Sequence, residues 1–428
     1  MLGRYFFDKT ERGIDFVWMQ HDREKILEGR HLLTEASEEG DADALCFLSR
    51  TYMGAQYVWQ YSGLDEDDDR AEKLLRESIQ RGSACGVLIA MRCGVLTLYE
   101  RRSMPFASLK EAWNIVYKKA EAGHPFCQYI IGNTYFWWDI FEIEGTKPVQ
   151  KYQTMENAEL AMAQLAEPWF ERAAAGGLES AVNNWYALYD GTNGYPENKA
   201  QQLEIARRGA EAGFPVWMYN YGWDLDHNGC YSEAHKYLQR AADMGQASAW
   251  IILGNQYLNG NGVPEDRAAA LRCYENGARS GLTDAQYMTA LLYYQGKGVQ
   301  KDSAKVFYWA QRAVVEGEDK EAYVLLGHVL LRGEGTQKDE KKGLDLLLTA
   351  QKHDVQEYEK KGRYLFSQEI RGILCGDLGD VYADGIVVNQ DYEKAIAYYD
   401  VVAGWDSYAQ AQRARFKKSF FSRKWTRR

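Results

Sequence analysis

The stretch GQASAWIILGNQYLNGNGVPEDRAAALRCYENGARSG, from Gly245 to Gly281, decides the fold. It recurs without gaps as GLTDAQYMTALLYYQGKGVQKDSAKVFYWAQRAVVEG, from Gly281 to Gly317, and EDKEAYVLLGHVLLRGEGTQKDEKKGLDLLLTAQKHD follows directly. The first two copies therefore repeat every 36 residues. Self-similarity at such a period is the signature of an array of small structural repeats, each too small to bury its own apolar face.

Each copy predicts two helices. The first helix carries Ala249, Leu253, Gly254 and Tyr257, and this spacing places small and apolar side chains on one helical face. A glycine inside a helix costs about 1 kcal/mol relative to alanine. Its recurrence predicts that a neighbouring helix passes too close for a Cβ atom. The glycines concerned are Gly132, Gly222, Gly254, Gly327 and Gly379.

Turns and caps separate the two helices. A turn such as Gly260-Asn261-Gly262-Val263 follows the first helix, and Asp266, Asp302, Asp339 and Asp391 are placed to cap the second. The second helix closes at a glycine, which accepts the left-handed conformation there. The same closing glycine recurs upstream, which extends the array toward the N-terminus, at Gly40, Gly82, Gly123, Gly177, Gly213 and Gly245.

These residues resemble the Sel1-like repeats, which are relatives of the tetratricopeptide repeats. The resemblance covers roughly residues 22–406 and implies an all-α fold: an α/α right-handed superhelical solenoid of about nine Sel1-like helix-turn-helix repeats. Residues 1–21 are expected to form an N-terminal cap, and residues 407–428 a basic tail. The period stretches near 138–156 and 355–372, so we expect insertions there, as loops on one face.

Charge is distributed unevenly along the chain. The 428 residues carry a net charge of −10. Because Ser407–Arg428 holds eight basic residues and no acidic one, residues 1–406 carry −18. An acidic body repels phosphate backbones, so contact with nucleic acid or a membrane is expected only through the basic tail 413–428. That tail, RARFKKSFFSRKWTRR, could also dock on the acidic body or form a frayed, solubilising end.

Cysteine usage and hydropathy indicate a cytoplasmic setting. The seven cysteines are scattered without a CxxC pair, which argues against a disulfide framework and favours a reducing compartment. No run approaches about 20 consecutive apolar residues, so we expect no membrane-spanning helix. The opening MLGRYFFDKTERG is not expected to act as a secretory signal, because charges directly follow its short apolar patch.

The sequence holds no recognisable catalytic or metal-binding pattern. The histidines form no HExxH motif, and the GxG turns lack the strand and the GK[ST] of a phosphate loop. The acidic run from Asp65 to Asp69 has Arg70 where a calcium loop needs glycine, so we expect a helix cap at Asp69 instead. We therefore predict a protein that is not an enzyme and needs neither cofactor nor metal.

The tetratricopeptide resemblance implies that the first helix of each pair lines a concave groove. Counting from the repeat's alanine, the groove takes roughly offsets 2, 6, 9 and 10. This predicts partner-binding residues that are rich in Tyr, Trp and Asn. They are Tyr129, Asn133, Phe136 and Trp137; Tyr219, Trp223, Asp226 and His227; Ile251, Asn255 and Asn259; Tyr287, Leu291 and Tyr294; and Val324 and His328. The competing interpretation is that these side chains pack against the next repeat.

Two functions remain open at this point. The first is a scaffold or adaptor that holds another protein or peptide in the groove, with no small-molecule substrate. The alternative is a dedicated inhibitor, such as an immunity protein that neutralises a toxin or enzyme by direct binding, which an acidic surface would suit if the target is basic. An enzyme is a third hypothesis, which the motif search disfavours.

Overall fold

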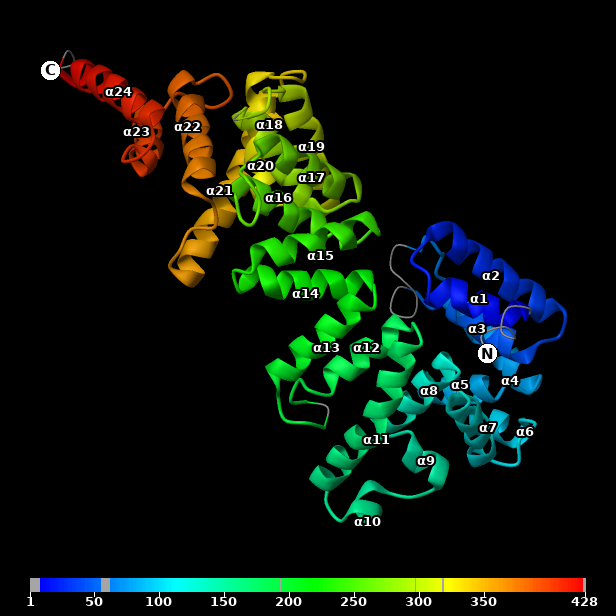
Figure 1. Cartoon of the computed structure of the whole chain (residues 1–428). Helices are drawn as coiled ribbons and strands as arrows, with labels where there is room; N and C mark the ends of the chain where they lie inside the picture. The colour runs from blue at the N-terminus through cyan, green and yellow to red at the C-terminus, as the bar shows by residue number, and fades with distance from the viewer. Residues whose placement is uncertain (1–7, 55–61, 193, 297, 318, 426–428) are drawn as a thin grey trace. The chain divides into compact units, whose positions relative to one another are not determined.

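Helices joined by short turns make up the regular structure of this chain (Figure 1). The computed structural model describes residues 8–54, 62–192, 194–296, 298–317 and 319–425, and within these ranges there is no strand. The predicted all-α fold class is therefore confirmed. The chain divides into two units, residues 1–246 (unit 1) and 247–428 (unit 2). The sequence predicts one uninterrupted array instead, and the boundary directly follows the shortest repeat step, from Gly213 to Gly245.

Unit 1 consists of helix pairs, two of which have short helices inserted between their first and second helix. Its helices are α1 Lys9–Trp18, α2 Arg23–Glu38, α3 Ala42–Arg50, α4 Asp68–Gln80, α5 Ala84–Arg92, α6 Leu98–Ser103, α7 Leu109–Glu121, α8 Pro125–Phe136, α9 Ile140–Glu144, α10 Pro148–Tyr152, α11 Met155–Ala175, α12 Glu179–Ala187, α13 Lys199–Glu211, α14 Pro215–His227 and α15 Tyr231–Asp243. The paired helices are α1 with α2, α3 with α4, α5 with α7, α8 with α11, α12 with α13, and α14 with α15.

Unit 2 repeats the same arrangement with fewer interruptions. Its helices are α16 Ala249–Asn259, α17 Arg267–Arg279, α18 Thr283–Gln295, α19 Ser303–Gly317, α20 Lys320–Arg332, α21 Glu340–Lys361, α22 Gln368–Asp384, α23 Tyr392–Val402 and α24 Ser407–Trp425. Each even-numbered helix from α16 to α22 packs against the odd-numbered helix that follows it. No helix among the described residues is long and apolar enough to cross a bilayer.

The recurrent glycines bring the two helices of a pair into close contact, as predicted. A Cβ atom added to Gly254 on α16 would lie 2.7 Å from the Tyr274 ring on α17. The corresponding distance is 2.6 Å from Gly132 to the Phe170 ring, and 2.8 Å from Gly327 to Leu347. Gly222 and Gly379 face a second-helix side chain in the same way. The helical cost of each glycine is thus offset by a large side chain that packs directly on the backbone.

Four of the predicted aspartate N-caps of second helices are confirmed, and the fifth prediction named the wrong residue. The carboxylates of Asp266, Asp302, Asp339 and Asp391 accept hydrogen bonds from backbone N–H groups two or three residues later. In the acidic run, Asp67 caps α4 by accepting from the N–H of Arg70, so the prediction of Asp69 was wrong. Asp69 lies in the first turn of α4, where a negative charge favours the helix N-terminus.

Both predicted insertions are more helical than the loops we expected. Residues 138–156 contain the short helices α9 and α10 and the start of α11. Residues 355–372 continue α21 to Lys361 and begin α22 at Gln368, so this insertion lengthens two helices of the array.

The segment expected to be a tail forms α24, which packs against α22 and α23. The Phe416 ring stacks on Tyr399, with 6.0 Å between centroids, and Lys417 pairs with Asp400 at 3.3 Å. A frayed end is therefore wrong for residues 407–417. Side chains from Lys418 onward, which carry most of the predicted basic patch, lie outside the described part of the chain.

The N-terminal segment is built into unit 1, although residues 1–7 of the predicted cap lie outside the described residues. The Trp18 ring lies 5.1 Å from Phe126 on α8, centroid to centroid. The Thr10 hydroxyl donates to Asp41 at 2.6 Å, and His21 Nε2 lies 2.8 Å from a Glu179 carboxylate oxygen. The segment from α1 to His21 thus contacts several successive repeats.

Candidate partner-binding surface

Within each unit, first helices of several neighbouring pairs contact one another and form a wall. In unit 1 the contacts run in the order α3, α5, α8 and α12, and in unit 2 they run in the order α18, α20, α22 and α24. Repeats of this kind pack only against their neighbours, so the residues that a first helix leaves uncovered repeat at similar positions along the wall. We call the open side of the first helices in each unit, α14 and α16 included, the first-helix face.

Two tryptophans stand exposed on first helices of unit 1. Trp137 at the end of α8 is 47% exposed, and Trp223 on α14 is 42% exposed. The guanidinium carbon of Arg92 on α5 lies 4.7 Å from the centre of the Trp137 ring. His227 stacks on Trp223 at 3.8 Å between centroids and is itself exposed. These predicted residues are therefore available to a partner, and Arg92 joins them.

Other predicted residues of unit 1 are partly or fully used by the fold. Asn133 accepts a hydrogen bond from the side-chain amide of Asn184 at 2.6 Å, which links α8 to α12. Tyr129 is half-buried, with its ring centroid 6.0 Å from that of Phe126. Tyr219 and Asp226 are also half-buried. Phe136, which we expected in the groove, belongs to the buried core.

The predicted tyrosines of unit 2 form the half-buried edge of its core. Ile251, Tyr287, Leu291 and Tyr294 pack against the buried cluster of this unit. Burial raises the pKa of Tyr294 to about 12, so its hydroxyl stays protonated. Asn255 and Asn259 are exposed; the Asn255 side-chain oxygen already accepts from the Tyr274 hydroxyl at 2.6 Å.

The structure corrects the placement of Val324 and His328. Both are buried, and only 8% of His328 is exposed. His328 Nδ1 lies 2.6 Å from one oxygen of the buried Asp377 on α22, and the Arg332 guanidinium donates to the other oxygen at 2.7 Å. The Asp377 carboxylate of the next repeat contacts both His328 and Arg332, so His328 belongs to a network between α20 and α22.

Sequence reasoning missed the charged members of this network. Arg332 is at offset 10 of the eighth copy, and Asp380, which accepts from Arg332 at 3.2 Å, is at offset 6 of the ninth. The same offsets that predicted the aromatic residues would have found both. Arg92 had no such signal, because the second copy lacks the Leu-Gly pair that fixes the register.

Asp139 sits beside the exposed Trp137 and is held in an unfavourable environment. Burial raises its pKa to about 6, although the nearby Arg92 guanidinium, 3.2 Å away, acts in the opposite direction. The folded chain therefore takes up a proton on Asp139 more readily than the unfolded chain does. Stability from this group is present at low pH and is lost as the pH rises from about 4 through about 6.

We predict that Asp139→Asn raises the midpoint of thermal unfolding at pH 7.5, and that the gain disappears near pH 4. The amide has the same shape but carries no buried charge at neutral pH. Thermal melts of both proteins across this pH range measure the effect. Glu142→Gln, which neutralises the more exposed carboxylate of α9, is the control and should show no such gain. A gain that persists unchanged at pH 4 would contradict the assignment.

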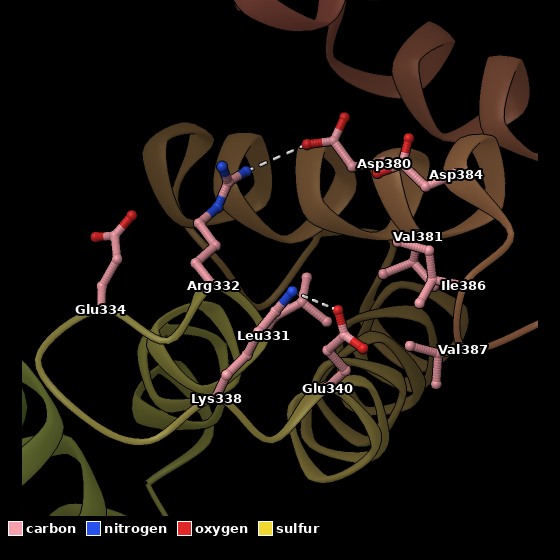
Figure 2. A pocket seen from close by; sticks show the side chains of 10 residues that line it. All are labelled: Leu331, Arg332, Glu334, Lys338, Glu340, Asp380, Val381, Asp384, Ile386 and Val387. Carbon is pink, nitrogen blue, oxygen red and sulfur yellow. Dashed lines mark hydrogen bonds and ion pairs between the residues drawn. The ribbon is translucent and has the colours of Figure 1, made fainter.

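Unit 2 also contains a pocket of about 400 Å³ where α20 and α22 end (Figure 2). Arg332 points toward Asp380, and Lys338 toward Glu340, in Figure 2. The aliphatic side chains of Leu331, Val381, Ile386 and Val387 form the apolar part of the lining. The described residues contain no group of three or more His, Cys, Asp or Glu side chains placed to hold a metal ion.

Comparisons with known proteins give distant relatives. Chitin synthase regulatory factor 3 of Schizosaccharomyces pombe is 28% identical over 171 residues, which is 36% of this chain and 18% of that protein. An uncharacterised protein of Neisseria meningitidis serogroup B is 25% identical over 302 residues, which is 69% of this chain and 54% of that protein. The chain thus spans less than a fifth of the first relative and about half of the second.

A solved structure and a family model also match this chain. The structure of a protective antigen of uropathogenic Escherichia coli, which displays an SLR fold, matches with a TM-score of 0.43 and 20% identity over 91% of this chain and 90% of that one. The Sel1 repeat model matches residues 42–83, 163–178, 209–246, 251–282, 283–314, 320–350 and 375–400. Sel1 repeats are typically non-catalytic scaffolds that mediate protein–protein interactions. Because the matched segments make up just over half of its residues, this chain belongs to the Sel1 repeat family.

Proposed function

We propose that this protein is a non-catalytic cytoplasmic scaffold that holds a protein or peptide partner against its first-helix face. The observation that carries the proposal is the exposure of Trp137 and Trp223 on first helices of unit 1. Neither ring is enclosed by the fold, although burying a tryptophan is strongly favourable in water. A partner that covers both rings would gain that free energy.

The exposed residues of the first helices in each unit suit a polypeptide. Tryptophan and arginine are the residues most often found at binding hot spots, and Arg92 lies against the Trp137 ring. On unit 2, considered by itself, the exposed Asn259 of α16 offers an amide group that can both donate to and accept from a peptide backbone, and Asn255, whose oxygen accepts from Tyr274, offers its NH₂ group. The acidic body, at −18 over residues 1–406, favours a protein partner over a nucleic acid.

We predict that Trp223→Ala weakens partner binding at least tenfold and changes the free energy of unfolding by less than about 1 kcal/mol, because an exposed side chain contributes little to the core. The partner is first identified by affinity purification from the native cell and mass spectrometry. Its dissociation constant is then measured by calorimetry for the parent and the variant. Trp137→Ala should behave in the same way.

Tyr99→Ala is the matched control, since Tyr99 is 78% exposed but lies on α6, outside the first helices. It should leave binding unchanged. Equal binding by the parent and both tryptophan variants would overturn the proposal. A cooperative loss of the fold in Trp223→Ala would show instead that this ring serves stability.

The second candidate function is a dedicated inhibitor of a basic protein, and the acidic body favours it. Stoichiometry and affinity separate it from an adaptor. An inhibitor should form one 1:1 complex of nanomolar affinity or tighter, whereas adaptors usually bind at micromolar levels. The same calorimetric titration reports both quantities.

A further inference from the structure

The pocket at the ends of α20 and α22 has an excess of negative charge. Its two basic side chains are already paired: Arg332 with Asp377 at 2.7 Å and Asp380 at 3.2 Å, and Lys338 with Glu340 at 2.5 Å. Two further carboxylates, Glu334 and Asp384, line the pocket, and neither has an ion-pair partner among the described residues. The basic groups of the pocket are therefore neutralised, and two acidic groups remain.

The helix ends add to this negative potential. α20 ends at Arg332 and α22 ends at Asp384, and each is closed by a glycine in the left-handed conformation, Gly333 and Gly385. The last carbonyl groups of a helix carry a partial negative charge and favour a cation. Two such ends therefore border the same pocket, and Figure 2 shows Asp384 on the α22 side.

The apolar lining lies next to these carboxylates. Ile386 is 71% exposed, which is unusual for its type, and Val387 and Val381 lie beside it in Figure 2. A simple inorganic cation would gain nothing from this surface. Lysine and arginine side chains combine both properties, because their aliphatic stems lie along apolar groups while the charged head stays among polar ones.

We propose that this pocket binds a lysine or arginine side chain of the protein partner, with its stem on Ile386 and Val381 and its cationic head at Asp384. This rests on the proposed function, because it assigns the chemistry of one contact in the same scaffold. The pocket occurs where neighbouring repeats place their turns side by side. The basic residue would thus fix the register of the partner on unit 2.

The test uses the full chain and small probes, so that it does not depend on an identified partner. The δ1 methyl group of Ile386 is labelled with ¹³C and assigned with Ile386→Val. N-acetyl-arginine methylamide and N-acetyl-lysine methylamide are titrated, with the uncharged citrulline analogue as the third arm. We expect a saturable shift with a millimolar dissociation constant for at least one basic probe, and at least fivefold weaker binding of citrulline.

A matched pair of variants tests whether the Asp384 carboxylate binds the cationic head of the probe. Asp384→Asn should weaken binding of the basic probe at least fivefold. Asp345→Asn, which removes the same charge from an exposed position on α21, should leave binding unchanged. Circular dichroism melts of both variants establish that they fold like the parent. Raising the salt concentration should weaken binding of the charged probes only.

The proposal would be overturned by citrulline binding as tightly as the tighter basic probe, by equal losses in Asp384→Asn and Asp345→Asn, or by no saturable shift at Ile386. A shift produced by magnesium chloride but by neither basic probe would also overturn it, in favour of an inorganic cation site. Because no protein partner enters this assay, its failure is distinguishable from a failure of the proposed function, which the tryptophan variants test separately.

Discussion

Asp354→Ala is expected to destabilise unit 2 by about 4 kcal/mol, the largest effect that we predict for a single substitution. Asp354 is buried on α21, within the predicted repeat but next to the insertion that follows it. One carboxylate oxygen accepts from the backbone N–H groups of Leu365 and Phe366, at 2.9 and 3.1 Å. The other accepts from Arg371 Nε at 3.1 Å. A single side chain therefore holds the segment between α21 and α22 in place.

The size of the effect follows from the burial of both charges. Arg371 is as buried as Asp354, and its guanidinium carbon lies 3.5 Å from the centre of the Tyr364 ring. Removing one partner of a buried ion pair leaves the other charge uncompensated, which typically costs 3–5 kcal/mol. Two backbone N–H groups also lose their acceptor.

Urea unfolding followed by circular dichroism measures the loss. Asp345→Ala, an exposed carboxylate on the same helix, is the control and should change stability by less than about 0.5 kcal/mol. Asp354→Asn should fall between the two, because the amide oxygen can still accept from the backbone while the charge is lost. A destabilisation of Asp354→Ala below about 1 kcal/mol would contradict the role we assign to the insertion.

The contrast between Asp354 and the repeat residues shows what sequence can predict. Gly254 and Asp266 act within one helix pair, so their roles follow from spacing alone, and the structure confirms both. Asp354 acts on Leu365 and Phe366, which belong to a stretch without a counterpart in other copies. The stretched period identified extra residues, but gave no reason to expect that they would extend α21 and α22.

The same limit applies to the candidate site. Offsets within a repeat correctly predicted that Trp137 and Trp223 are exposed. They failed at His328, because its burial depends on Asp377 in the next repeat. Whether a first-helix residue faces solvent therefore depends on its own repeat and on the next one. The sequence of the ninth copy is degenerate and does not fix the register of that repeat.

Gly343→Ala is expected to destabilise the α20–α21 pair by about 3 kcal/mol. A Cβ atom at Gly343 would lie 2.8 Å from the backbone nitrogen of Leu331 and 2.9 Å from the carbonyl oxygen of Gly327. A Cβ at Gly327 would in turn lie 3.0 Å from the carbonyl oxygen of Gly343. Here backbone meets backbone, so no change of side-chain rotamer can relieve the overlap, and the helices must separate.

That separation should be visible locally. Stability in a repeat protein is a sum over neighbouring interfaces, so amide hydrogen exchange is expected to rise first in α20 and α21, before α16 and α17 respond.

Gly404→Ala is the control: nothing lies within 4 Å of its Cβ position, and alanine should be neutral or slightly stabilising there. Alanine also gains about 1 kcal/mol of helix propensity at Gly343, so a net loss measures a steric cost that exceeds this gain. Unchanged exchange in α20 would mean that the two helices can separate without loss of stability. The close contact of the two backbones would then not explain why this repeat has glycine at both positions.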